Sequence, residues 1–221
     1  MKRVLVANAK GGVGKTLISV TLAAALSNKR QTVTLADADP QASALQWIKR
    51  RSVYYPRVDY VSWRVGTAEK PIFVKKTDFV IIDAPSGIDK DLIQPYLRKC
   101  DFLVVPIVAS VFDEAASRKF IIALQQIKKF RDAEIRLIPV GSRVNLRRRE
   151  TTLLCDFMKY NTLELKTMIS ERSAYPNLAR RGMSIFDVNT AENVKLRAQW
   201  RPILDEIMIG SNQNEPNDPA N

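Results

Sequence analysis

The chain has 221 residues, enough for one α/β domain with a sizeable core, and its hydrophobic fraction of 46% is ordinary for a globular protein. No apolar run approaches the roughly 18 residues that cross a membrane. Two isolated cysteines, Cys100 and Cys155, make no disulfide framework and argue against an iron–sulfur cluster. The formal net charge of +12 favours a polyanionic partner, nucleic acid or anionic lipid, although a basic surface can also serve solubility alone.

Short apolar runs that predict buried strands alternate along the chain with segments of helical apolar spacing. This alternation predicts an α/β fold with a doubly wound, mostly parallel sheet and right-handed crossovers. In chain order we expect a strand at 3–8, a helix at 15–28, a strand at 32–36, a helix at 42–51, strands at 58–62, 78–83 and 102–106, a helix at 113–131, a strand at 135–140, and helices at 148–160, 173–181 and 191–208.

A glycine-rich turn separates the first strand from the first helix. Its glycines let the backbone approach phosphates and turn N–H groups inward, its lysine reaches the β- and γ-phosphates, and its hydroxyl binds Mg²⁺. The helix that follows adds the positive end of its dipole. The residues expected to bind the nucleotide here are Gly11, Gly12, Val13, Gly14, Lys15, Thr16 and Leu17, with Thr16 also on the metal.

The start of this turn departs from the general phosphate-loop pattern. Ala9 stands where the first glycine of Gly-x-x-x-x-Gly-Lys-Thr would be, and Lys10 follows it. Lys-Gly-Gly-x-Gly-Lys-Thr resembles the deviant Walker A motif of the ParA/MinD family of P-loop ATPases. The resemblance implies that ATP is the nucleotide and that Lys10 reaches across a homodimer to the partner's nucleotide, offsetting transition-state charge as an arginine finger does. The alternative is a solvated loop lysine.

Three aspartates, Asp37, Asp39 and Asp83, come at or just past the C-terminal ends of expected strands. Ligands of open α/β sheets bind at that edge, so the three carboxylates are expected to converge on the phosphate loop. Asp83 resembles a Walker B aspartate that holds Mg²⁺ through water. By resemblance to the family's first switch, Asp39 orients the attacking water and Asp37 lies near the metal. For both, the alternative is capping of the helix that starts near Gln41.

Later segments resemble family elements more loosely. Residues 83–88 resemble a second switch, and the segment that ends at Asp113 resembles one near the dimer interface, where Asp113 alternatively caps its helix. Ser142, Arg143 and Asn145 lie where relatives often contact adenine. The alternative for Asn145 is an exposed loop asparagine without a role in binding.

Basic residues gather in the last third of the chain. ParA-like dimers bind DNA without sequence preference through this region, and scattered arginine and lysine suffice because only phosphates need neutralising. A solvated face is the alternative for any one of them. The residues expected to contact DNA are Arg147, Arg148, Arg149, Arg172, Arg180, Arg181, Lys195 and Arg197.

The resemblance covers residues 1–145 by motif and is strongest to short ParA-type partition ATPases. It implies a slow ATPase that forms an ATP-sandwich dimer and binds DNA. A ParB-like centromere-binding protein or a cargo adaptor stimulates hydrolysis, so that plasmid or chromosomal DNA is segregated. The same cycle can instead position a protein cargo, such as a carboxysome or chemoreceptor cluster, on the nucleoid. A P-loop small-molecule ligase or kinase is the second alternative, although no substrate pocket is identifiable.

The end of the chain differs in composition from the rest. We expect residues 1–209 to form a single domain and residues 210–221, which are rich in asparagine and proline, to form a disordered tail. This polar end has no apolar face, which argues against a lipid anchor. With no signal peptide expected either, the predicted location is cytoplasmic and nucleoid-associated.

Overall fold

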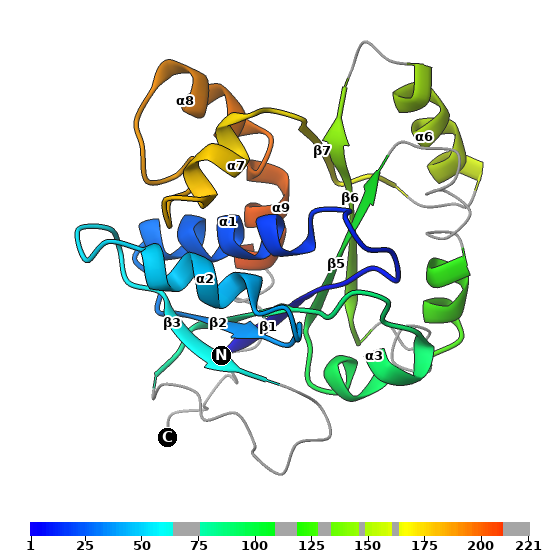
Figure 1. Ribbon diagram of the computed structural model, residues 1–221. Helices are drawn as coiled ribbons and strands as arrows, with labels where there is room; N and C mark the ends of the chain where they lie inside the picture. Colours follow the sequence, from blue (N-terminus) through cyan, green and yellow to red (C-terminus); the bar gives the residue numbers. More distant parts are fainter. Residues whose placement is uncertain (64–75, 109–118, 128–133, 146–148, 161–163, 210–221) are drawn as a thin grey trace, which may run out of the picture.

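A seven-stranded parallel sheet runs through the protein in the computed structural model, which describes residues 1–63, 76–108, 119–127, 134–145, 149–160 and 164–209 (Figure 1). The strand order is β3-β2-β4-β1-β5-β6-β7, and every neighbouring pair is parallel. The predicted α/β fold with a doubly wound sheet is therefore confirmed.

The elements follow the expected alternation. The strands are β1 Lys2–Val6, β2 Val33–Asp37, β3 Asp59–Ser62, β4 Phe79–Asp83, β5 Phe102–Val108, β6 Arg136–Val144 and β7 Thr167–Ser170. The helices are α1 Lys15–Asn28, α2 Ser43–Arg50, α3 Lys90–Leu97, α6 Arg149–Tyr160, α7 Ala174–Ala179, α8 Ala191–Ala198 and α9 Arg201–Ile209, and residues 119–125 are also helical.

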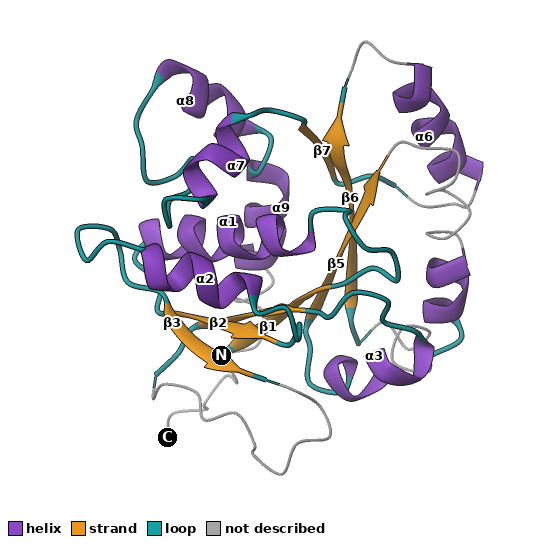
Figure 2. Cartoon of the chain, in the orientation of Figure 1, coloured by secondary structure: helices purple, strands orange, loops and turns teal. Residues whose placement is uncertain are grey.

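Helices cover both faces of the sheet, as Figure 2 shows. Successive strand residues point to opposite faces, so Val4 and Val6 of β1 join the core beneath α1, α2, α7, α8 and α9. Leu5 of the same strand joins the core beneath α3, residues 119–127 and α6. Two buried faces explain why the strands read as continuous apolar runs instead of alternating ones.

Three elements differ from the expectations. A helix, α3, begins where Asp89 caps the backbone N–H groups of Asp91 and Leu92, and a short strand, β7, completes one edge of the sheet. The expected helix at 191–208 is two helices, because Pro202 lacks an N–H and its ring clashes with a preceding turn, so α9 starts afresh after Trp200. The expected tail at 210–221 lies outside the described residues, as does Asp113.

The order of the strands places a ligand site at the end of β1. The chain leaves β1 towards β2 on one side and later crosses to β5 on the other, so the direction of winding reverses beside this strand. Crevices at the carboxyl ends of strands at such a point are where ligands of open α/β sheets bind. The glycine-rich turn follows β1 at this edge (Figure 1).

Candidate functional site

The glycine-rich turn owes its shape to two left-handed residues. Gly12 has a φ of 75° and Gly14 a φ of 91°, a region that other residues adopt only with strain. A Cβ atom on Gly14 would also lie 3.0 Å from the side-chain oxygen of Ser142. The conformation and the tight space therefore both select glycine at position 14.

The N-terminus of α1 is open to an anion. Gly14 stands at the N-cap without a side chain to bond the first N–H groups, and the first turn carries no acidic residue. Unbonded N–H groups and the positive end of the helix dipole together favour a phosphate at this place.

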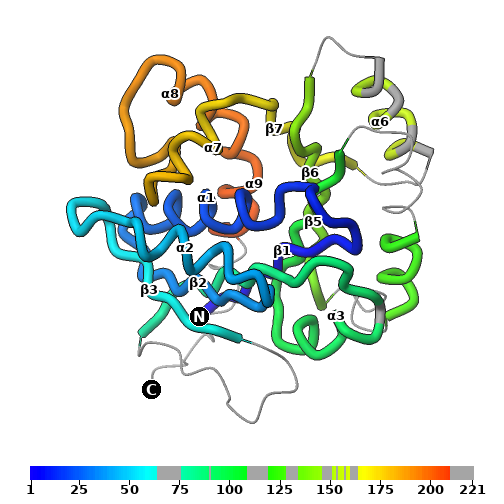
Figure 3. The backbone as a smooth tube through the Cα atoms, in the orientation of Figure 1, coloured from blue at the N-terminus to red at the C-terminus, as the bar shows by residue number. Residues whose placement is uncertain are grey.

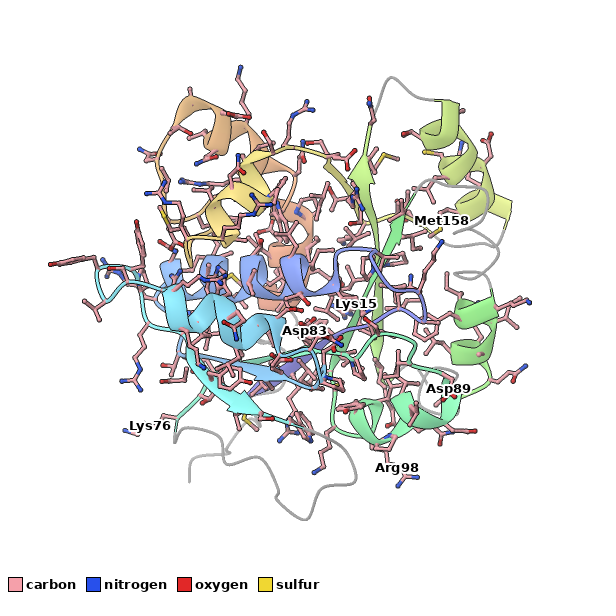
Figure 4. All side chains as sticks on the ribbon, in the orientation of Figure 1. Lys15, Lys76, Asp83, Asp89, Arg98 and Met158 are labelled. Carbon is pink, nitrogen blue, oxygen red and sulfur yellow. The ribbon has the colours of Figure 1, made fainter. Side chains whose placement is uncertain are left out.

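Lys15 begins α1 and is held by the turn itself. Its side chain is almost completely buried, and Nζ donates a hydrogen bond of 3.0 Å to the carbonyl oxygen of Lys10. Burial lowers the pKa of Lys15, while the negative charges of Asp83 and Asp39 oppose that change. Figure 4 shows Lys15 and Asp83 near one another at the centre of the molecule. The lysine thus stands as a desolvated cation next to the open helix end.

Asp83, the last residue of β4, is fully buried. Its Oδ1 accepts a hydrogen bond of 3.0 Å from Ser19 of α1, whereas Oδ2 has no hydrogen-bond partner within the described part of the chain. Burial raises the pKa of Asp83 to about 7; the charges of Asp37 and Asp39 add to the rise and the hydroxyls of Thr16 and Ser19 oppose it. A buried carboxylate with an unsatisfied oxygen fits a role beside a cation.

Asp37 and Asp39 follow β2 and are already engaged with backbone. Asp37 accepts hydrogen bonds of 3.1 Å from the N–H groups of both Asp39 and Leu45. Burial raises the pKa of Asp37, while these N–H groups oppose the change. Asp39 accepts from Gln41 at 2.9 Å and from the N–H of Ser86 at 3.1 Å, so it joins the segments that follow β2 and β4. Asp37 therefore bonds an N–H group in the first turn of α2, as a capping residue does, whereas the partners of Asp39 lie outside that helix.

The donors of this edge suit a magnesium site completed by phosphate. Asp37 and Asp83 face each other in register on β2 and β4, yet no three aspartate, glutamate, cysteine or histidine side chains of the described segments gather as metal ligands. Mg²⁺ keeps several waters and binds through one or two carboxylates together with substrate phosphates. The Thr16 hydroxyl and the free oxygen of Asp83 fit such a set.

The end of β6 braces the turn from the other side. The Ser142 hydroxyl donates a hydrogen bond of 2.8 Å to the carbonyl of Val13, and Arg143 Nη1 lies 3.5 Å from the carbonyl of Gly12. Arg143 also pairs with Glu171 at 2.8 Å. Ser142 thus contacts the turn, and Arg143 contacts both the turn and Glu171. The predicted contacts with adenine, Asn145 included, stay predictions.

Asn8 is a site residue that the sequence analysis missed. Its side chain is buried, donates 2.7 Å to the carbonyl of Pro106 in β5, and accepts 3.0 Å from the backbone N–H of Lys10. Asn8 therefore fixes where the turn leaves the sheet. A polar residue directly after the apolar run of residues 4–7 was the available signal, because buried polar groups need partners.

The residues expected to contact DNA fall into two groups. Arg172, Arg180, Arg181 and Lys195 are exposed. Arg197 is engaged within the fold, since it donates to the carbonyls of Ile185 at 2.8 Å and Val188 at 2.7 Å. Arg147 and Arg148 lie outside the described residues, and Arg149 begins α6.

Among the helices that the structure describes, none has the length and apolar character of a membrane span.

Comparison with known proteins gives a family for this architecture. A model of the CobQ/CobB/MinD/ParA nucleotide binding domain matches residues 4–185. The maintenance of carboxysome distribution protein A of Halothiobacillus neapolitanus is 28% identical over 207 residues, which cover 91% of each chain. The chromosome-partitioning ATPase Soj of Thermus thermophilus is 25% identical over 63% of this chain and 68% of its own. A putative plasmid partition protein of Borrelia burgdorferi bound to AMPPNP superposes with a TM-score of 0.66 at 18% identity, covering 93% of this chain and 99% of that one.

Proposed function

Because this chain belongs to the CobQ/CobB/MinD/ParA nucleotide-binding family, whose ParA and MinD members are P-loop ATPases, we propose that it binds ATP with Mg²⁺ and slowly hydrolyses it. The observation that carries the proposal is the phosphate loop. Its left-handed Gly12 and Gly14 precede a helix N-terminus without a cap or an acidic first turn, with a buried lysine at the first helical position.

The site residues divide the work of such an ATPase. The N–H groups of residues 11–17 bind the phosphates, and Lys15 contacts the β- and γ-phosphates. Mg²⁺ offsets the charge that develops on those oxygens. Thr16 and Asp83 hold it, and Asp37, in register with Asp83, adds negative charge nearby. Asp39 orients the attacking water from the segment after β2.

Hydrolysis in this proposal takes place in an ATP-bound homodimer, with each Lys10 completing the partner's site. Support comes from the lysine's position ahead of Gly11, where Asn8 holds its backbone N–H. The variant Lys10→Ala keeps nucleotide binding and loses ATP-dependent dimerisation, measured by light scattering with and without ATP. Full dimerisation of this variant in ATP would contradict the role across the dimer.

The dimer binds DNA non-specifically through its exposed basic residues and is released when a partner protein stimulates hydrolysis, which places it on the nucleoid. For the cargo, we favour positioning of a protein assembly, because the relative named for carboxysome distribution aligns over 91% of both chains. Segregation of DNA is the second candidate, supported by the partitioning ATPase Soj. A cargo adaptor is the partner in the first case and a ParB-like protein in the second.

The proposed ATPase activity is tested at Lys15. Replacing it in Lys15→Gln removes the cation beside the phosphates, and we expect ATP turnover to fall by at least about 100-fold. Phosphate release and ATP binding are measured together, and thermal melting confirms that the variant folds. Lys159→Gln, an exposed lysine on α6, is the matched control. Wild-type turnover in Lys15→Gln would refute the proposal.

A further inference from the structure

The end of the molecule farthest from the phosphate loop carries a concentration of exposed positive charge. The helices α1, α2 and α7 all end there, and Figure 3 shows the connection from α2 to β3 extending beyond the end of α1. Seven exposed cationic residues lie at these helix ends and in that connection, and we call them the helix-end basic patch: Lys29, Arg30, Lys49, Arg50, Arg57, Arg180 and Arg181.

Direct backbone packing brings the ends of α2 and α7 together. A Cβ atom on Gly182 would lie 2.3 Å from the carbonyl carbon of Arg50, so the two backbones touch. Arg51 donates 3.2 Å to the carbonyl of Gly182 and forms an ion pair of 2.9 Å with Asp187, whose side chain is fully buried. Arg180 and Arg181 are therefore held in place beside the end of α2.

The end of α1 joins the same surface. The Ser27 hydroxyl donates a hydrogen bond of 2.7 Å to the carbonyl of Arg57, which ties the connection between α2 and β3 to α1. Lys29 and Arg30 follow directly. Three separate segments thus bring these cations onto one surface, at backbone positions that are fixed by packing.

Few acidic groups balance this charge. Asp187 is used by the buried Arg51, and Asp59 pairs with Arg57. The other six residues of the helix-end basic patch form no ion pair with any described residue. Their positive field is therefore available to an external anion.

An apolar tip projects from the patch. Val53 and Tyr54 are each 93% exposed, whereas the neighbouring Tyr55 turns back under Arg51, whose guanidinium lies 5.5 Å from its ring. A turn holds the tip, since Ser52 accepts from the N–H of Tyr54 at 3.3 Å through its hydroxyl and from that of Tyr55 at 3.2 Å through its carbonyl. An exposed aromatic ring among arginines can stack on a base or wedge into a minor groove.

We propose that the helix-end basic patch and the Val53–Tyr54 tip form a DNA-contacting surface. This role rests on the proposed function and extends DNA contact from Arg180 and Arg181 to residues outside the late basic region. Five of the seven cations are arginines, whose planar forks match phosphate oxygens. Two apolar side chains contribute about 1.5–3 kcal/mol each on burial, less than an amphipathic helix with its continuous apolar face gains at a membrane. DNA therefore fits this surface better than lipid.

The test measures binding of random-sequence duplex DNA in ATP as a function of salt. We expect Lys49→Ala with Arg50→Ala to weaken binding by about 10-fold or more and to reduce the log–log salt slope by about two, since each lost phosphate contact removes about 0.9. Tyr54→Ser weakens binding several-fold without changing the slope, because the tyrosine carries no charge. Melting curves verify the fold of each variant.

The matched control removes the same charge from the opposite face of the sheet, with Lys119→Ala and Lys159→Ala. Equal losses in patch and control variants would overturn the assignment of the surface, and so would unchanged affinity in the patch variants. If the patch variants lose binding to phosphatidylserine vesicles while DNA binding is intact, the surface is a lipid surface. Failure of the wild-type protein to bind DNA at any salt concentration would instead refute the proposed function, and this surface with it.

Discussion

The two ends of α1 handle charge in opposite ways. At the phosphate loop, Lys15 and Asp83 are buried. Burial lowers the pKa of Lys15 and raises the pKa of Asp83, which favours the neutral form of each. At the other end, Lys29 and Arg30 stand in solvent. Buried charges act strongly over short distances, whereas exposed charges are screened by salt and bind reversibly. The two ends of α1 thus differ in use: the buried end suits reaction at a phosphate, and the exposed end suits reversible binding of a polyanion.

The sharpest exception to this contrast is Arg51, a buried charge at the exposed end. Its side chain is 5% exposed and its partner Asp187 is 0% exposed. Arg51→Ala leaves that carboxylate uncompensated, so we expect a loss of about 3–5 kcal/mol in the free energy of unfolding. Urea denaturation measures it, with the neighbouring exposed Arg50→Ala expected to stay within about 0.5 kcal/mol. Equal losses in both variants would show that burial does not distinguish them.

Asp83 tests whether burial of charge at the nucleotide end costs stability. The variant Asp83→Asn removes the charge, and we expect ATP turnover to fall by about 100-fold while the free energy of unfolding rises by on the order of a few kcal/mol at pH 8. Phosphate release and denaturation measure the two effects. A variant that is both active and no more stable than wild type would contradict the roles given to the carboxylate.

The same carboxylate predicts a direction with pH. Its pKa is about 7 in the folded protein, so between about pH 4 and pH 7 the folded state retains a proton that the unfolded state has lost. The stability of the metal-free protein relative to Asp83→Asn therefore falls as pH rises through this window and is level above it. A wild-type stability that rises relative to that of Asp83→Asn as pH increases through this window would reverse the sign and exclude a raised pKa.

Ser142 gives the smallest of these effects. Its buried hydroxyl bonds the carbonyl of Val13, so Ser142→Ala is expected to cost about 1–2 kcal/mol of stability and to weaken ATP binding several-fold. Ser184 is as buried but bonds the N–H of Phe186, away from the loop. Ser184→Ala should therefore lower stability alone, and calorimetric titration with ATP separates the two serines. Equal ATP affinity in both variants would mean that Ser142 does not brace the loop.

The nucleotide end could be predicted from sequence because its signals are local. The residues of a phosphate loop are consecutive in the sequence, and Asp83 is the last residue of an apolar strand that is buried on both faces. The hydrogen bonds of Asp37 to Leu45 and of Ser142 to Val13 could not be predicted, since they depend on how separate elements pack. Pro202, by contrast, was a readable signal that the last helical pattern would break.

The helix-end basic patch shows what a linear reading misses. Arg180 and Arg181 were singled out because they fall in a run of late basic residues, but Lys49 and Arg50 lie far from them in the sequence. Only the fold brings the two pairs together, through the close approach of Gly182 to Arg50. The charge total of the chain predicted a polyanionic partner without indicating which face would meet it.

The burial of α1 has a mechanical consequence. Residues 18–27 are all buried, so the helix has little freedom to bend along this stretch, about 15 Å of its length. A rearrangement of the loop that holds Lys15 would therefore move α1 as one rigid unit. Its far end is tied through Ser27 to Arg57. A small displacement of α1 at the phosphate loop would then change the spacing of the cations in the helix-end basic patch at its other end.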